Sequence, residues 1–362
     1  MSDYSNLDIK KVVVFGGTGA QGSSIVKREY QHQYLLVYYY LSDTIKELSE
    51  AEKFIITIPT RNTESASAAQ LAKLKGVGLL DADYESEEGL RKAFAGQDAC
   101  YFNINSFTVG EPYEYFWTFR AYEIAVQSKL KWFVLSGGPD RLKQYGYEEK
   151  YRNSHGTVKA KISDWLSHQP LDILPWTILY GGVYAQMLSS LLQPKKGRDG
   201  VYHFIAPIAN GSIPFVDLDD YGVRTRYVFE NPGECVGKSI GWGAWYTSYP
   251  ELIRAFKKAT GNEAVFHDLT QEEWFEKLRP YVDAESRLPK GVSLDDRTAF
   301  TFRRTFGAWW NLWKDGDNIR DKEQEKRNRD WSDKVYPGRC QNIEEWMIKS
   351  KYTGKWEILM FF

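Results

Sequence analysis

The stretch VVVFGGTGAQGSSIV, residues 12–26, joins an apolar, β-branched run to a glycine-rich loop and then to a serine-led helical segment. A short apolar run closed by glycines is typical of a buried parallel strand. Gly17, Gly19 and Gly22 give the spacing GxGxxG, and Gly16 extends the pattern to GxxGxxG. A loop of this kind presents backbone N–H groups and the positive end of a helix to a pyrophosphate. The stretch therefore predicts a dinucleotide-binding loop.

Strand-like and helix-like segments alternate from this loop to about residue 182. The expected strands cover residues 11–17, 53–60, 76–83, 99–105, 131–137 and 176–182. Strands that alternate with helices of about 10 to 15 residues form right-handed βαβ units. The sequence therefore predicts an α/β protein with a Rossmann-type, doubly wound parallel sheet.

Two regions depart from this rhythm. Residues 30–52 are longer than a first βαβ unit needs, so we expect an inserted helix or helical hairpin on the flank of the sheet. After residue 183 the pattern changes to short strands and helices. We therefore expect a Rossmann core over residues 8–182 that contains the insertion. A smaller α+β substrate-binding part with a helical C-terminal extension should cover residues 183–362 and close over the carboxyl edge of the sheet.

Charge and cysteine content exclude several classes of function. The 47 Lys and Arg nearly cancel the 48 Asp and Glu, which argues against nucleic acid or an anionic membrane as partner. The three cysteines include no CxxC pair, which argues against a disulfide framework and against a metal site. No apolar run approaches the roughly 18–20 residues that span a bilayer, and the polar N-terminus does not resemble a signal peptide. We expect a cytoplasmic protein.

Aromatic residues make up 15% of the chain, which suits either a pocket for a flat small molecule or a thick protein interface. Residues 299–313 place Phe302, Phe306, Trp309 or Trp310, and Trp313 at spacings of three and four, on one face of a helix. We interpret this stripe as core or as the seam of a homodimer rather than as a cofactor box.

The end of the second expected strand decides which dinucleotide is preferred. An NAD site usually has a carboxylate there for the ribose 2′-hydroxyl, whereas an NADP site has a cation for the 2′-phosphate. The segment IPTRN offers Thr60, Arg61 and Asn62 and no carboxylate. The sequence therefore predicts NADP(H), with Arg61 on the phosphate; a merely solvated Arg61 is the alternative. The loop residues expected to hold the same cofactor are Gly16, Gly17, Thr18, Gly19, Ala20, Gln21 and Gly22.

Several motifs, in this order along the chain, resemble those of the NmrA-like family, atypical members of the short-chain dehydrogenase superfamily. They are DYESEEGLRKAF (83–94), LSGGPD (135–140), GGVYAQML (181–188) and IPFVDLDDYG (213–222). The closing NIEEWMIKS is similar to the end of many fungal members. The resemblance implies a Rossmann core, a preference for NADP and a substrate cleft between the core and the C-terminal part.

Ordinary members of that superfamily use a Tyr-x-x-x-Lys pair on a helix and a Ser at the end of the preceding strand. The matching segment here is HGTVK, so His155 replaces the Tyr, Lys159 matches the Lys and Ser136 matches the Ser. His155 is either a general acid/base or a group that only hydrogen-bonds near the nicotinamide. Lys159 is expected to contact the ribose or nicotinamide.

Ligands bind outside the carboxyl ends of parallel strands. Asn103 and Asn105, at the end of the fourth strand, are therefore expected to line the cofactor. Tyr184 and Gln186, after the sixth strand, are expected to line the substrate cleft.

Two functions follow from these predictions. The first is an NADP(H)-dependent oxidoreductase that acts on an aromatic or alkaloid-like carbonyl or imine in secondary-metabolite biosynthesis, or a catalyst of a cyclisation that keeps the cofactor as a scaffold. The second is a non-catalytic NADP(H) sensor that binds a regulatory protein partner, either a transcription factor or an enzyme. The missing Tyr favours the second function, and the aromatic content favours the first.

Overall fold

The computed structural model describes residues 4–16, 44–289 and 292–354. Its largest sheet has seven strands, all paired in parallel, in the order β11-β6-β5-β4-β1-β2-β3. These strands are β1 (Lys11–Val14), β2 (Ile55–Thr60), β3 (Val77–Asp81), β4 (Ala99–Phe102), β5 (Trp132–Ser136), β6 (Trp176–Tyr180) and β11 (Ser239–Gly241). The strand order reverses between β1 and β4, which is the arrangement of a Rossmann fold. The predicted doubly wound sheet is confirmed.

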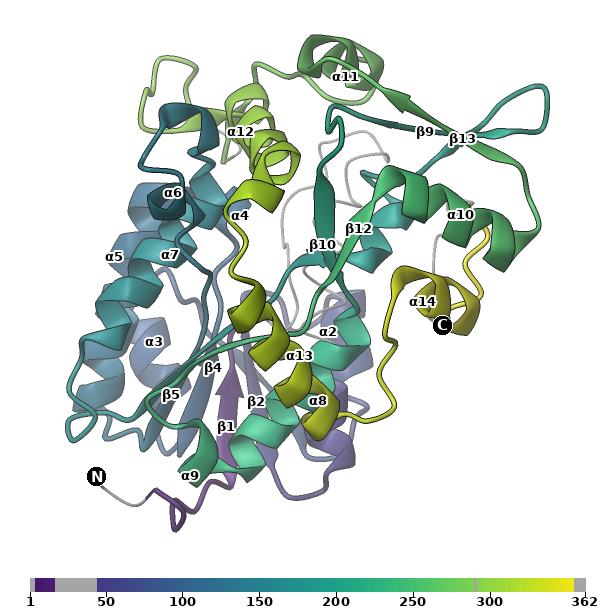
Figure 1. Ribbon diagram of the computed structural model, residues 1–362. Coiled ribbons are helices and arrows are strands. Elements are labelled where there is room, and N and C mark those ends of the chain that lie inside the picture. Colours follow the sequence, from purple (N-terminus) through teal and green to yellow (C-terminus); the bar gives the residue numbers. More distant parts are fainter. Residues whose placement is uncertain (1–3, 17–43, 290–291, 355–362) are drawn as a thin grey trace.

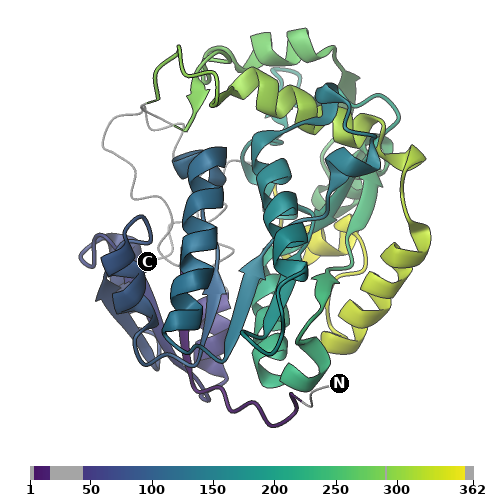
Figure 2. The ribbon, with the colours of Figure 1, turned by 90° about the vertical axis from the view of Figure 1, so that its left-hand side faces the viewer.

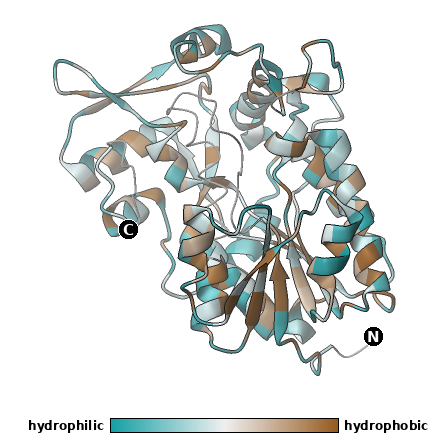
Figure 3. Ribbon diagram, turned by 180° about the vertical axis from the view of Figure 1, so that it is seen from behind, coloured by the Kyte–Doolittle hydropathy of each residue, from teal (hydrophilic) through white to brown (hydrophobic). Residues whose placement is uncertain are grey.

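Helices cover both faces of this sheet because successive side chains of its strands point to opposite sides. Val12 and Val14 of β1 belong to one buried cluster, and Val13 and Phe15 belong to another. Figure 2 shows α5 and α7 side by side on one face, and Figure 3 shows the hydrophobic strands enclosed between the two helical layers. The first face carries α3 (Glu87–Phe94), α5 (Glu111–Gln127) and α7 (Ser154–Ser167), and the second carries α2 (Ala66–Leu71), α8 (Leu218–Glu230), α9 (Pro232–Cys235) and α13 (Lys322–Val335).

Side-chain caps determine where these helices begin. Ser86 accepts a hydrogen bond from the backbone N–H of Gly89 at the start of α3, and Asn153 accepts one from Gly156 at the start of α7. Such caps pair backbone donors that have no partner within the helix. The cap at Asn153 fixes the start of α7, and with it the position of His155 in the first turn.

The end of the expected insertion is helical, as predicted. Residues 44–50 form a helix, and Ile45 and Leu48 are buried in the cluster on the second face of the large sheet. Residues 30–43, like the loop residues Gly17, Thr18, Gly19, Ala20, Gln21 and Gly22, lie outside the described residues.

A second part lies above the carboxyl edge of the large sheet (Figure 1). It contains two three-stranded sheets, β12-β10-β7 and β13-β9-β8, and a short pair, β14-β15. Its strands are β7 (Val183–Tyr184), β8 (Lys195–Lys196), β9 (Tyr202–Ala206), β10 (Ser212–Val216), β12 (Trp245–Ser248), β13 (Ala264–Asp268), β14 (Arg287–Leu288) and β15 (Phe300–Thr301). Its helices are α10 (Tyr249–Thr260), α11 (Gln271–Leu278), α12 (Phe302–Lys314) and α14 (Ile343–Lys349).

The two parts interleave along the chain. The edge strand β11 pairs with β6, and α8 packs on the second face of the large sheet, although both follow residue 182. The large sheet therefore extends past the boundary that the sequence suggested. Short connecting helices shape its carboxyl edge: α4 (Ser106–Val109), α6 (Arg141–Gln144), and the 3₁₀ helices η1 (Glu149–Tyr151), η2 (Ala185–Ser189) and η3 (Gly316–Asn318).

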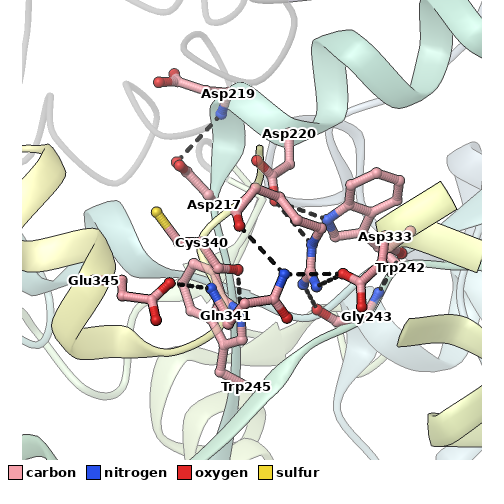
Figure 4. Close-up of polar contacts among 12 residues, drawn as sticks. Asp217, Asp219, Asp220, Trp242, Gly243, Trp245, Asp333, Cys340, Gln341 and Glu345 are labelled. Carbon is pink, nitrogen blue, oxygen red and sulfur yellow. Dashed lines mark hydrogen bonds and ion pairs between the residues drawn. The ribbon is translucent and has the colours of Figure 1, made fainter. Parts of the chain in front are cut away.

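The C-terminal segment is attached to the core by a polar cluster that includes Asp220, Trp242 and Asp333 (Figure 4). Arg339, which is buried, lies at its centre. The Arg339 guanidinium contacts Asp220, Asp333 and the carbonyl oxygen of Gly243. Trp242 Nε1 donates to Asp220 Oδ2 at 3.0 Å. Burial, together with Asp217, raises the pKa of Asp220 to about 7. This cluster connects α8, the chain after β11 and the segment that leads to α14.

Three further observations concern the described residues only. Cys100, Cys235 and Cys340 are all buried and free. In the described ranges, no His, Cys, Asp and Glu side chains gather in threes or more in a way that could hold a metal ion. None of the helices described has the length and apolarity needed to cross a bilayer.

Candidate functional site

A cavity of about 310 Å³ lies outside the carboxyl ends of β4, β5 and β6. Asn103 and Ile104 line it after β4, residues 136–141 line it at and after β5, and Gly181 and Gly182 line it after β6. Helix α12 and the start of α7 complete its walls. This is the edge at which open parallel sheets bind their ligands.

Lys159, on α7, is held firmly in the cavity wall. Its ammonium contacts Asn103 Oδ1 at 3.1 Å, the carbonyl oxygen of Ile104 at 2.9 Å and Glu114 Oε1 at 2.8 Å. Glu114 is fully buried, whereas 18% of the Lys159 side chain is exposed. The first two contacts are hydrogen bonds and the third is an ion pair, because neither Glu114 oxygen has a hydrogen-bond partner among the described residues. An ammonium group has three protons to donate, so Lys159 could contact a ribose with the third.

His155 lies one helical turn before Lys159, and the two side chains share a face of α7. Burial first, and then the charge of Lys159, lowers the pKa of His155 to about 4. Its ring packs against Phe107, with ring centroids 4.8 Å apart. Its buried Nδ1 has no hydrogen-bond partner among the described residues. At neutral pH the imidazole is therefore uncharged and has a nitrogen available to a ligand.

Ser136 is the last residue of β5, is partly exposed, and lines the cavity. The backbone after it passes very close to α7, since a Cβ atom on Gly137 would lie 2.2 Å from Ser163 Oγ. Ser163 Oγ accepts a hydrogen bond from Gly138 N and donates one to the carbonyl oxygen of Lys159. Glycine at 137 therefore lets β5 bring Ser136 to the same cavity as His155 and Lys159.

Aromatic rings form a continuous wall of the cavity. The Phe107 ring is stacked on that of Phe306 with a centroid distance of 6.1 Å, and Phe306, Trp309 and Trp313 follow at 6.0 and 5.7 Å. The buried Nε1 of Trp313 has no partner in the described part of the chain. Phe306 and Trp309 meet at 63° and Trp309 and Trp313 at 88°, so the wall presents both faces and edges of rings, and it includes one unused hydrogen-bond donor.

The aromatic side chains of α12 thus lie in two environments, the core of the second part and the cavity wall. Phe302 and Trp310 are buried in the core of the second part, as predicted. Phe306 and Trp309 are also buried in that core, but they line the cavity together with Trp313. Sequence spacing identifies the helical face but does not show which members of it border a cavity.

The two residues expected after β6 differ in position. Tyr184 lines the cavity, and its ring meets that of Tyr221 edge-on at 5.8 Å. Gln186 instead donates to Asp217 Oδ1 at 2.7 Å and accepts from Leu218 N at 3.3 Å, and it is not among the lining residues. It supports the start of α8, and the expected contact of each residue with substrate remains a prediction.

Asn105 lines the same cavity but already has a structural role. Its Oδ1 accepts from Phe107 N at the start of α4, while its buried Nδ2 has no partner among the described residues. Asn103 is engaged by Lys159. Both asparagines are therefore placed at the strand end where they were expected.

The end of β2 holds the residues expected at the adenosine end of a dinucleotide. Thr60 closes the strand, and its hydroxyl accepts from Asn62 N at 3.3 Å. The Arg61 side chain is 39% exposed and contacts Glu85 at 3.4 Å and Asp83 at 3.9 Å. These two carboxylates, which follow β3, were not expected. A 2′-phosphate would have to share the Arg61 guanidinium with them.

Two residues that shape the site were not predicted from the sequence. Glu114 compensates Lys159, and Arg141 lines the cavity at the start of α6. Arg141 follows the LSGGPD motif directly, and that position after a strand end was the available signal. Glu114 had no signal, because it lies on the buried face of a helix far from Lys159 in sequence.

Comparison with known proteins agrees with this architecture. The model of the NmrA-like family matches residues 8–347. The chain belongs to the NmrA-like family. An NmrA-like family domain-containing protein of Dictyostelium discoideum is 24% identical over 276 residues, which cover 73% of this chain and 82% of that protein. An NmrA-like family domain-containing oxidoreductase of Aspergillus flavus is 25% identical over 277 residues, which cover 72% and 76%.

Solved structures of this fold include both a regulator and an enzyme. The negative transcriptional regulator Nmra, in complex with NAD, superposes with a TM-score of 0.68 at 16% identity, covering 94% of this chain and 95% of that one. An NADPH-dependent quinone oxidoreductase of Escherichia coli, complexed with NADPH, superposes with a TM-score of 0.58 at 15% identity, covering 94% and 99%. At these identities the likeness establishes the NmrA-like fold alone.

Proposed function

We propose that this NmrA-like protein is an NADP(H)-dependent oxidoreductase that reduces the carbonyl or imine group of a flat aromatic molecule in secondary-metabolite biosynthesis. One observation carries the proposal. A single cavity at the carboxyl edge of a Rossmann sheet brings Ser136, His155 and Lys159 next to an aromatic wall. The oxidoreductase of Aspergillus flavus supports the reaction class.

The chain offers suitable groups for the cofactor. Thr60, Arg61 and Asn62 would lie at its adenosine end, and Asn103 and Lys159 at its nicotinamide end, as the strand order of the sheet implies. Arg61 favours the 2′-phosphate of NADP, although Glu85 and Asp83 compete for its guanidinium. Solved proteins of this fold bind NAD in one case and NADPH in another.

Bound NADPH would supply the hydride, and the residues of this chain would position the acceptor and deliver the proton. The Ser136 hydroxyl would donate a hydrogen bond to the oxygen or nitrogen of the electrophile. Lys159, which has ammonium protons to donate, would be the source of the proton. His155 is uncharged at neutral pH, since the pKa of its imidazole is lowered to about 4. Its role would be to hydrogen-bond the substrate.

The test separates binding from turnover. NADPH and NADH binding are measured by calorimetry, and the loss of NADPH absorbance is followed against a panel of aromatic ketones, aldehydes and imines. Ser136→Ala and Lys159→Met are expected to lower turnover by about 100-fold or more. The matched control is Ser167→Ala, on the same helix α7 but outside the cavity lining; it is expected to keep wild-type turnover. Binding of NADPH without turnover on any member of the panel would exclude the proposal.

One observation favours a second function, an NADP(H)-sensing regulator that binds a transcription factor or an enzyme. His155 stands where the superfamily has its catalytic Tyr, and it is uncharged at neutral pH. The regulator Nmra has the same fold. An NADP-dependent complex with a protein partner, together with the absence of turnover, would support this function instead.

A further inference from the structure

Arg141 differs from the other cation of the cavity in having no carboxylate to compensate it. It is the first residue of α6 and lines the cavity. Its guanidinium contacts only neutral groups, Gln144 Oε1 at 3.2 Å and the Tyr246 hydroxyl at 3.5 Å. The adjacent Asp140 is occupied elsewhere, because its Oδ1 caps α6 and its Oδ2 pairs with Lys161 at 2.9 Å. No carboxylate within the described ranges forms an ion pair with Arg141.

The neighbours that Arg141 contacts directly are neutral. The rings of Tyr180 and Tyr246 are close enough for its charge to act on them, and burial nevertheless raises the pKa of both hydroxyl groups. Both phenols therefore remain protonated at neutral pH. Glu325, which also engages the Tyr246 hydroxyl, forms its own ion pair with Arg320 at 2.7 Å. The charge of Arg141 itself therefore makes this part of the cavity lining complementary to a negatively charged group.

Aromatic rings of α12 form another part of the lining, and the end of α12 packs against α6. Phe306, Trp309 and Trp313 line the cavity in sequence, and Trp313 has an unused, buried N–H donor. Lys159 adds no free charge, because Glu114 pairs with it at 2.8 Å. The uncompensated positive charge of the described lining is therefore that of Arg141.

We infer that the cavity takes an aromatic carboxylate, whose ring lies on the wall of α12 and whose carboxylate is bound by Arg141. The planar guanidinium matches a carboxylate with two parallel hydrogen bonds. This inference rests on the proposed function for the use of the site, and it narrows the substrate to an aromatic acid that carries the reducible carbonyl or imine. Arg141 then determines specificity and does not take part in the chemistry.

The test uses 2-naphthoate and its neutral counterpart 2-naphthamide as probes of the full-length protein. Their binding is measured by calorimetry and by quenching of tryptophan fluorescence, without dinucleotide. Wild-type protein is expected to bind naphthoate at least about tenfold more tightly than naphthamide, as a charge-assisted hydrogen-bonded contact implies. Arg141→Met should abolish this difference, and Arg141→Lys should restore it only in part. Lys143→Met, an exposed change on the same helix, should leave it unchanged.

Three outcomes with the probes alone would overturn the inference. They are equal binding of the two probes by wild-type protein, no measurable binding of either, and unchanged naphthoate binding by a folded Arg141→Met variant. Displacement of naphthoate by NADP⁺ would assign Arg141 to a cofactor phosphate and would also overturn it. The proposed function fails separately. Selective binding of naphthoate without reduction of any aromatic keto acid would contradict the proposed oxidoreductase function and support the carboxylate site at Arg141. Rapid reduction of neutral ketones with no preference for acids would support the oxidoreductase function and contradict the carboxylate site.

Discussion

Two cations, Lys159 and Arg141, line the cavity, and they differ in whether a carboxylate pairs with them. Lys159 has two carbonyl oxygens and a fully buried carboxylate around its ammonium. Arg141 has an amide oxygen and a phenol, and both distances exceed 3.1 Å. Equal charge therefore does not imply equal availability to a ligand.

The difference lies in the neighbouring residues, because both cations are partly exposed. A carboxylate removed from water must be compensated, because desolvation costs several kcal/mol. Glu114 is fully buried and forms its ion pair with Lys159, whereas no described carboxylate forms an ion pair with Arg141. The family motif HGTVK thus contains Lys159, which is already paired with Glu114. Arg141, which follows the motif LSGGPD, has no such ion pair and is available to bind a ligand.

The largest expected effect on the free energy of unfolding comes from removing the carboxylate that pairs with Lys159. Glu114→Ala leaves Lys159 without its counter-charge and should lower the free energy of unfolding by about 3 kcal/mol, near the lower end for broken buried pairs because Lys159 keeps its two carbonyl acceptors. Urea denaturation at pH 7 measures it. Glu123→Ala removes an exposed carboxylate of the same helix, α5, and should cost less than about 1 kcal/mol. Equal losses in the two variants would show that Lys159 does not need its counter-charge.

A smaller effect is expected from pH at His155. The folded protein holds this imidazole uncharged, with its pKa lowered to about 4, whereas in the unfolded chain it titrates near 6.5. The unfolded state therefore binds more protons between these values, and stability falls as the pH falls. Relative to His155→Phe, wild-type protein should lose about 2 kcal/mol of unfolding free energy between pH 7 and pH 5.

The control for this measurement lies on the same helix. His168, at the end of α7, is exposed, so His168→Phe should keep the wild-type dependence on pH. An identical pH dependence in wild-type protein and His155→Phe would show that folding does not lower the pKa of the imidazole. An imidazole that titrates near its ordinary pKa would restore His155 as a candidate proton donor.

The sheet was predictable because its strands are short apolar runs closed by turn residues, and all six expected strands occur. The edge strand β11 was assigned to the second part, since a three-residue strand carries no periodic signal and its partner β6 is distant in sequence. The glycine-rich loop that indicated the fold lies largely outside the described residues. Its contacts with a dinucleotide remain a prediction.

The site was predictable only where a motif fixes spacing. Ser136, His155 and Lys159 share one cavity, because a strand end and a helical turn place residues reliably. The ion pair of Lys159 was not predictable, because Glu114 meets it through the packing of α5 on α7, which are far apart in sequence. Glu85 meets Arg61 because each follows one of two neighbouring strands, β3 and β2. That approach follows from the strand order, whereas sequence spacing contains no information on the contact between α5 and α7.

The smallest effect on stability is expected at Arg141. If Arg141 differs from Lys159 in having no structural ion pair, its replacement must cost little. Arg141→Met removes two long, neutral contacts and strands no buried charge, so the free energy of unfolding should change by less than about 1 kcal/mol. Urea denaturation beside Glu114→Ala gives the contrast directly. A loss as large as that of Glu114→Ala would mean that Arg141 is a structural cation like Lys159. A small loss means that the fold does not need the guanidinium, and a partly buried charge that the fold does not need is available to bind a ligand.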